Sequence, residues 1–184
     1  MPEFIAYAEA NPGKINYGSG GVGSGTHMPA ELFKMMTGVN MSPVQYRGEA
    51  PALTDLLGGH VQVVFADTAG ASEYVKAGKL RPLAVGSATR WAALPEVPTV
   101  GEFVPGYEAR FWTGIGAPRN TPVEIIDRLN HEINAGLGDP KMKARIADLG
   151  GIGLSGSPDE FGEFIAKEME KWAKVIREAN IKVE

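Results

Sequence analysis

A run of glycine and hydroxyl residues at positions 18–27, GSGGVGSGTH, is the part of this sequence best suited to binding a ligand. Gly18, Gly20 and Gly23 fit the pattern G-x-G-x-x-G. This pattern binds dinucleotides when it joins a strand to a helix and an acidic residue follows at the end of the next strand. The acid nearest to that role, Glu49, lies too far along the chain. A nucleotide-binding enzyme domain built on these glycines is therefore an alternative interpretation, not the leading one.

The same run suits a different anion. A phosphate-binding P-loop needs Lys followed by Ser or Thr where Thr26 and His27 stand. Glycine-rich backbone before a helix still exposes several N–H groups, and the helix dipole favours a negative charge there, a carboxylate included. Ser19, Ser24 and Thr26 add hydroxyl groups. The simpler alternative is a strand-to-helix turn in which Ser24 or Thr26 caps the helix.

Other kinds of chemistry find little support in the sequence. No serine stands in G-x-S-x-G, and the absence of cysteine removes thiolate nucleophiles and cysteine-based zinc sites. His27, His60 and His131 are isolated, with no partner at metal-ligand spacing. Asp67 either caps the helix that follows it or lines a cleft. These residues therefore favour neither a hydrolase nor a metal site, and we expect no metal and no cofactor.

The elements that position these residues alternate regularly between strand and helix over the first half of the chain. Short connections between such elements predict βαβ units and an α/β fold with a mainly parallel sheet. Ligand-binding groups in such sheets lie at the carboxyl ends of the strands. The predicted strands are 14–19, 41–48, 61–67 and 80–87, and the predicted helices are 28–37, 51–57 and 68–79.

Prolines and glycines interrupt this alternation over residues 88–118, and the last third is helical. Thr121–Glu124 and Ser157–Glu160 have the form of capping boxes, and Asp139 is suited to cap a helix between them. These helices have apolar stripes but little sheet in this half of the chain to pack against. We therefore expect part of their apolar surface to be exposed.

The composition is that of an ordinary folded protein. The 184 residues include 43% hydrophobic and 22% charged residues, so a packed core is expected. A net charge of −4 gives no reason to expect a nucleic acid or an anionic membrane as partner. No segment approaches the roughly 20 apolar residues of a membrane span. The first residues, MPEFIAYAEANPGK, lack the basic and apolar parts of a signal peptide and predict a short amphipathic helix.

Four segments, in this order, carry a resemblance to a known family. They are NPGKINYGSGGVGSGTHMPAELFKMMTG, VQYRGEAPALTDLLGGHVQVVFAD, AGKLRPLAVGSATRWAALPEVPTVGE and GAPRNTPVEIIDRLNHEIN. The steps Tyr46-Arg47-Gly48, Pro51–Gly59 and Leu94–Thr99 are the most specific. The chain resembles, over essentially its whole length, the substrate-binding proteins of tripartite tricarboxylate transporters, the Bug family of periplasmic solute receptors.

The resemblance implies a periplasmic-binding-protein-like fold of two α/β lobes joined by crossing strands. Residues 1–87 would form the second lobe, 88–118 the crossover segment and 119–184 the C-terminal helices of the first lobe. Members of the family carry a further segment before this point, which supplies most of the sheet of the first lobe. The resemblance therefore implies a chain truncated at its N-terminus, in which one βαβ lobe accompanies an incomplete first lobe.

The resemblance also implies a non-catalytic receptor that holds a small mono- or dicarboxylate between its lobes. On this mapping the 19–27 loop contacts the ligand, and 46–48 and 67–68 form neighbouring edges of the same cleft. The predicted ligand-binding residues are Ser19, Gly20, Gly21, Val22, Gly23, Ser24, Thr26, His27, Tyr46, Gly48, Asp67 and Thr68.

The transporter partner and the location follow from the same resemblance, whereas self-association follows from the apolar stripes of the C-terminal helices. Membrane subunits of a tripartite tricarboxylate transporter are expected in the full-length context, and a homodimer is expected through the exposed apolar helix faces. The family is periplasmic. Because no signal peptide is evident, the chain would be cytoplasmic if Met1 is the natural start.

Overall fold

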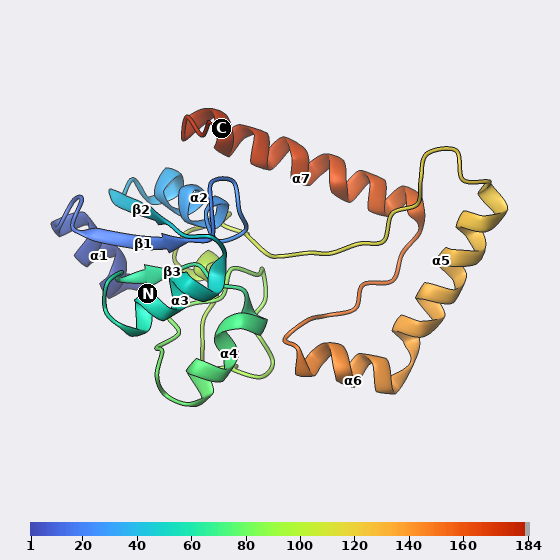
Figure 1. Ribbon diagram of the computed structural model, residues 1–184, viewed down its shortest axis with the longest axis horizontal. Coiled ribbons are helices and arrows are strands. Elements are labelled where there is room, and N and C mark those ends of the chain that lie inside the picture. Colours follow the sequence, from blue (N-terminus) through green and yellow to red (C-terminus); the bar gives the residue numbers. More distant parts are fainter. Residues whose placement is uncertain (183–184) are drawn as a thin grey trace. The chain divides into compact units, whose positions relative to one another are not determined.

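A three-stranded parallel sheet organises the N-terminal part of the chain (Figure 1). The computed structural model describes residues 1–182. The strands are β1 (Ile15–Ser19), β2 (Met41–Gln45) and β3 (Val63–Val64), in the order β2-β1-β3. Tyr17 of β1 pairs with Pro43 of β2. The α/β fold with a mainly parallel sheet is therefore confirmed.

The two faces of β1 pack against different helices. Ile15 and Tyr17 are buried in the main core together with residues of α1 (Pro2–Ala10) and α2 (Met28–Thr37). Gly18 faces α3 (Glu49–Leu57), where a Cβ atom would lie 3.1 Å from Ala52 Cβ and 3.0 Å from Val64 Cγ2. A side chain at position 18 would therefore push α3 away from the sheet.

The main core is almost entirely apolar, so its burial is the principal source of stability for the sheet and the helices that cover it. It joins the N-terminal elements to segment 100–109 and to one residue near the C-terminus. Its buried residues are Ala8, Ile15, Tyr17, Met28, Ala30, Leu32, Phe33, Val39, Met41, Val100, Val104, Tyr107, Ala109 and Val175.

The predicted strands after α3 are shorter than expected or absent. The predicted strand 61–67 is reduced to β3, and α4 (Thr68–Lys76) follows it. The prediction of a strand at 80–87 is wrong. Leu80 N–H donates back to Tyr74 O at 3.2 Å, and Val85 makes only an isolated bridge with Thr99. The segment thus packs against the irregular chain around the short 3₁₀ helix η1 (Val100–Glu102) instead of extending the sheet.

The chain divides into two compact units. One consists of Met1–Phe111 and the residues from Trp172 onward, and the other of Trp112–Lys171. The second unit contains α5 (Val123–Gly138), α6 (Pro140–Asp148) and the first part of α7 (Pro158–Glu178). The boundaries 1–87, 88–118 and 119–184, which rest on the family resemblance, remain predictions about the lobes of a complete receptor.

The predicted helix caps of the second unit are confirmed in two of three cases. Asp139 accepts hydrogen bonds from the N–H groups of Lys141 and Met142. Ser157 and Glu160 bond each other reciprocally, which lowers the pKa of Glu160. The capping box at Thr121 is wrong, because the Thr121 hydroxyl donates to Pro118 O and Pro122 takes the cap position.

Apolar side chains are exposed in the second unit, as the sequence predicted. Among the residues that the structure describes, no helix combines the length and apolar character needed to cross a membrane.

In the second unit, Val123 is 70% exposed and Ile152 is 78% exposed. The exposed large apolar residues of this unit are Trp112, Ile115, Val123, Ile125, Leu129, Met142, Leu149, Ile152, Leu154 and Met169.

Candidate functional site

The topology of the sheet points to the carboxyl end of β1 as the place for a ligand. From β1 the chain passes through α2 to β2 on one side, and from β2 it passes through α3 to β3 on the other side. The neighbouring strands β1 and β3 are therefore not consecutive in the chain, and the strand order reverses beside β1. Ligands of open α/β sheets bind in the crevice that such a reversal of strand order creates.

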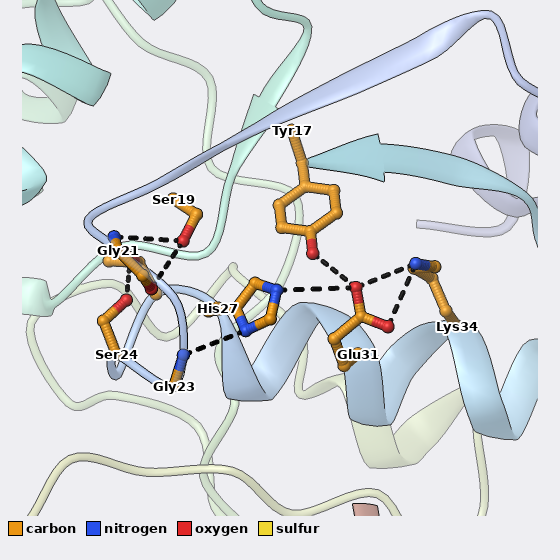
Figure 2. Close-up of polar contacts among 9 residues, drawn as sticks. Tyr17, Ser19, Gly21, Gly23, Ser24, His27, Glu31 and Lys34 are labelled. Carbon is orange, nitrogen blue, oxygen red and sulfur yellow. Dashed lines mark hydrogen bonds and ion pairs between the residues drawn. The ribbon is translucent and has the colours of Figure 1, made fainter. Parts of the chain in front are cut away.

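Segment 18–27 consists of the end of β1 and the loop that follows it, and side chains of the segment itself hold this loop (Figure 2). Thr26 Oγ1 accepts a hydrogen bond from Gly20 N–H at 2.6 Å and lies 3.0 Å from Ser24 Oγ. Ser19 Oγ donates to Gly21 O at 3.0 Å. The three hydroxyl groups predicted to face a ligand thus also bond within the loop, where they define its shape.

The start of α2 differs from the simple cap considered from the sequence. His27 occupies the cap position, and its side chain makes no capping hydrogen bond. Ser24 contributes its carbonyl oxygen, which accepts from the N–H groups of His27 and Met28 at 3.0 Å each. The prediction that the side chain of Ser24 or Thr26 caps α2 is therefore wrong.

Three backbone N–H groups of the loop have no acceptor among the residues that the structure describes. No hydrogen bond within residues 1–182 uses the N–H of Val22, Gly25 or Thr26. A Cβ atom at Gly25 would lie 2.0 Å from Phe111 Cε1, so the Phe111 ring lies directly against the loop. Unpaired backbone N–H groups beside an aromatic ring can receive a carboxylate and shield it from water.

The segment after β2 lies against this loop. Tyr46 N–H donates to Ser19 O at 2.7 Å, and Gly48 N–H donates to Gly20 O at 3.1 Å. The Tyr46 hydroxyl donates to Asp55 Oδ2 at 2.7 Å, which raises the pKa of Tyr46. The predicted 46–48 edge therefore contacts the loop through its backbone. The Tyr46 hydroxyl is instead hydrogen-bonded to α3.

Asp67 caps α4 and also lines an open depression. Its carboxylate accepts from Ala69 N–H at 3.2 Å, and its own N–H donates to both carboxylate oxygens of Glu49 at 3.1–3.2 Å. Thr68 is the first residue of α4 and is partly buried. The depression, of about 300 Å³, is lined by Glu49, Ala50, Leu53, Asp67, Gly70 and Tyr74.

Glu49 is a residue of this region that the sequence analysis did not place in the site. It starts α3, directly after Gly48, and burial raises the pKa of its carboxyl group. It joins the 46–48 segment to Asp67 through the hydrogen bonds from Asp67 N–H. The available signal was an acid directly after Gly48, between a predicted strand and a predicted helix.

Behind the loop, a buried polar group connects α2 with β1 (Figure 2). His27 Nδ1 accepts from Gly23 N–H at 3.2 Å, and His27 Nε2 lies 3.8 Å from Glu31 Oε1. The Glu31 carboxylate accepts from the Tyr17 hydroxyl at 2.5 Å and from Lys34 Nζ at 2.8 and 3.0 Å. Sequence reasoning missed this group, although His27, Glu31 and Lys34 have the i, i+4 and i+7 spacing of one helix face.

Metal binding finds no support in the part of the chain that the structure describes. No three residues among His, Asp and Glu lie together there in a way that could hold a metal ion. The polar cluster around Glu31 is not suited to a metal ion either, because Tyr17 and Lys34 already donate hydrogen bonds to its carboxylate.

Comparison with known proteins identifies the family. The family model of the tripartite tricarboxylate transporter family receptor matches residues 1–181. Protein BugT of Bordetella pertussis is 35% identical over 184 residues, which are all of this chain and 56% of BugT. The chain spans about half the length of the curated relatives it matches.

Solved structures agree in fold. R. palustris Rpa4515 with adipate has a TM-score of 0.88 and 38% identity over 98% of this chain and 61% of that chain. MatC from Rhodopseudomonas palustris with bound malate has a TM-score of 0.75 and 27% identity over 96% of this chain and 61% of that chain. These descriptions give the alternative of a nucleotide-binding enzyme no support. The chain belongs to the receptor family of tripartite tricarboxylate transporters.

Proposed function

We propose that this chain is part of a non-catalytic solute receptor for small mono- or dicarboxylates, with the 19–27 loop as one wall of its binding site. The observation that carries the proposal is the set of unpaired N–H groups at Val22, Gly25 and Thr26, which lies where the strand order of the sheet reverses. Similarity to structures with adipate and with malate supports this ligand class.

The charges around the site favour one position for the ligand carboxylate. Glu49 and Asp67 line the depression between α3 and α4, so a second negative charge there would be repelled. The 19–27 loop offers backbone donors at the start of α2, where the helix dipole is positive. A carboxylate therefore belongs at the loop, and the 67–68 edge suits a hydroxyl group or another uncharged part of the ligand.

Partners and location follow from the family. The receptor would act in the periplasm and deliver its ligand to the membrane subunits of a tripartite tricarboxylate transporter. The exposed apolar residues of α5 and α6 suit an interface between two copies of this chain. Light scattering coupled to size-exclusion chromatography should detect that dimer; a single monomer peak over a wide concentration range would contradict it.

Calorimetry on the purified chain with adipate and malate tests the ligand class. We expect both S24A and T26A to weaken binding, because each removes a hydrogen bond that shapes the loop. S42A, an exposed serine of β2, is the matched control and should bind as the wild type does. Binding of NAD or ATP with no response to a panel of carboxylates would instead favour the nucleotide alternative.

A further inference from the structure

His27 is the buried residue that links the ligand loop to the interior of the first unit. It is only 5% exposed, and its ring stacks on the Tyr17 ring with a centroid distance of 6.1 Å. One ring nitrogen faces the loop at Gly23 and the other faces Glu31 (Figure 2). A ligand would therefore meet the loop backbone and not the imidazole ring itself.

The hydrogen bond at Nδ1 fixes the form of the ring. Because Nδ1 accepts from Gly23 N–H, its lone pair is free of a proton. The neutral ring must then carry its proton on Nε2, on the side of the Glu31 carboxylate. Tyr17 and Lys34 hold that carboxylate from β1 and from the next turn of α2, so the ring cannot turn over without losing both contacts.

We propose that His27 is a positioning residue, which as the Nε2–H tautomer holds Gly23 N–H and so orients the 21–26 backbone for binding a carboxylate. The expected effect on carboxylate binding rests on the proposed function. The role of His27 in holding the loop rests on the contacts of its ring. Gly23 has a φ of +74°, a left-handed conformation in which its N–H is turned toward the His27 ring. With this donor occupied, the N–H groups of Val22, Gly25 and Thr26 remain for the ligand.

The arrangement makes the loop sensitive to pH. The titratable groups that face His27 are Tyr17 from β1 and Glu31 and Lys34 from α2. Burial lowers the pKa of His27 below its usual 6.5, a shift that Glu31 opposes and Lys34 reinforces. Protonation puts a hydrogen on Nδ1, so Nδ1 can no longer accept from Gly23. The loop should therefore lose its anchor as the pH falls through the lowered pKa.

Two variants of nearly equal size separate the two ring nitrogens. In H27N the amide oxygen can take the place of Nδ1 and accept from Gly23, whereas in H27Q the longer side chain reaches toward Glu31 and leaves Gly23 without an acceptor. We expect H27Q to bind adipate or malate about tenfold more weakly than the wild type, and H27N to recover most of that loss. H131Q, which removes an exposed histidine of α5, is the control.

Nuclear magnetic resonance provides a readout that needs no ligand. Long-range ¹H–¹⁵N spectra should show the Nε2–H tautomer of His27. The Gly23 amide resonance should titrate with His27 in the wild type and in H131Q, but not in H27N. Thermal unfolding and circular dichroism report whether each variant is folded.

The outcomes separate this inference from the proposed function. If the wild type binds no carboxylate, the proposed function fails while the spectra still decide the role of His27. A proton on Nδ1, or a Gly23 amide that exchanges equally slowly in the wild type and in H27Q, would overturn the inference whatever the binding result. Equal weakening of H27N and H27Q would also overturn it.

Discussion

The N–H of Gly48 donates to the carbonyl oxygen of Gly20 at 3.1 Å, and a Cβ atom at Gly20 would lie only 3.0 Å from the Gly48 carbonyl carbon. Two loops that follow different strands thus approach each other through backbone alone. The close approach requires glycine at position 20, so the spacing of the predicted ligand-binding loops depends on the absence of one side chain.

G20A should therefore push the 46–48 segment away from the loop and weaken the Gly48 hydrogen bond. We expect a loss of about 1–3 kcal/mol in the free energy of unfolding, measured by urea denaturation, together with weaker carboxylate binding. G136A is the matched control, because position 136 lies in α5 and an added Cβ there would meet nothing within 4 Å beyond its chain neighbours and the backbone of its own helix. A stability of G20A equal to that of the wild type would show that the two loops can separate without cost.

Replacement of Asp67 tests its two possible roles. D67A removes the acceptor for Ala69 N–H and should cost about 1 kcal/mol through loss of the α4 cap, whereas D67N keeps a capping oxygen and should cost little. Calorimetry then measures ligand binding by D67N. Unchanged binding would leave Asp67 as a cap alone, and a change of several-fold would support its predicted place at the ligand.

The Tyr17–Glu31 hydrogen bond is expected to stabilise the first unit. Y17F removes one donor and should cost about 1 kcal/mol, while E31Q leaves Tyr17 and Lys34 without their carboxylate and should cost about 2–3 kcal/mol. The double variant should cost less than the sum, because both changes disrupt the same contact. Urea denaturation gives all three values.

The exposed pair Lys76 and Glu73 has the same spacing as Lys34 and Glu31 and provides a control. K76Q should change the free energy of unfolding by less than about 0.5 kcal/mol, because solvent screens an exposed pair. Equal effects of K76Q and E31Q would contradict a role for burial at Glu31.

Glu102 should titrate far below an ordinary glutamate. The Arg90 guanidinium, and next the Thr99 N–H, lower its pKa to about 2 from the usual 4.5. A lowered carboxyl pKa stabilises the fold fully above pH 4.5, and this contribution is lost as the pH falls toward 2. Carboxyl titration by nuclear magnetic resonance should show the low value, a rise in R90Q, and no change in R128Q.

The sequence predicted the elements well where a short apolar segment is followed by clear signals for the start of a helix. β1, α2 and the caps of α6 and α7 lie where local patterns indicated them. The predicted strand 80–87 is wrong because a local pattern does not reveal pairing partners: Val85 forms an isolated bridge with Thr99 and does not pair with a strand of the sheet. Long-range pairing of this kind depends on the whole fold.

The candidate site was predictable as a loop but not as a set of contacts. Glycine content and position identified residues 19–27, and the parallel sheet placed 46–48 beside them. The cap that Asp67 forms with Ala69 is local and was one of its two predicted roles. The hydrogen bonds from the Tyr46 hydroxyl to Asp55 and from Asp67 N–H to Glu49, in contrast, join residues that only the folded chain brings within reach. Glu31 was missed because its partners Tyr17 and His27 come from a strand and from the loop itself.

Pro43 gives β2 a further property. Tyr46 N–H points to β1, so the alternation of a strand directs the N–H positions of residues 42 and 44 to the same side and that of Pro43 to the outer edge of the sheet. Proline has no hydrogen to donate there, so the outer edge of β2 is interrupted at its middle residue. A neighbouring molecule cannot add a continuous strand at this edge, and Pro43 thereby protects an open, three-stranded sheet against edge-to-edge aggregation.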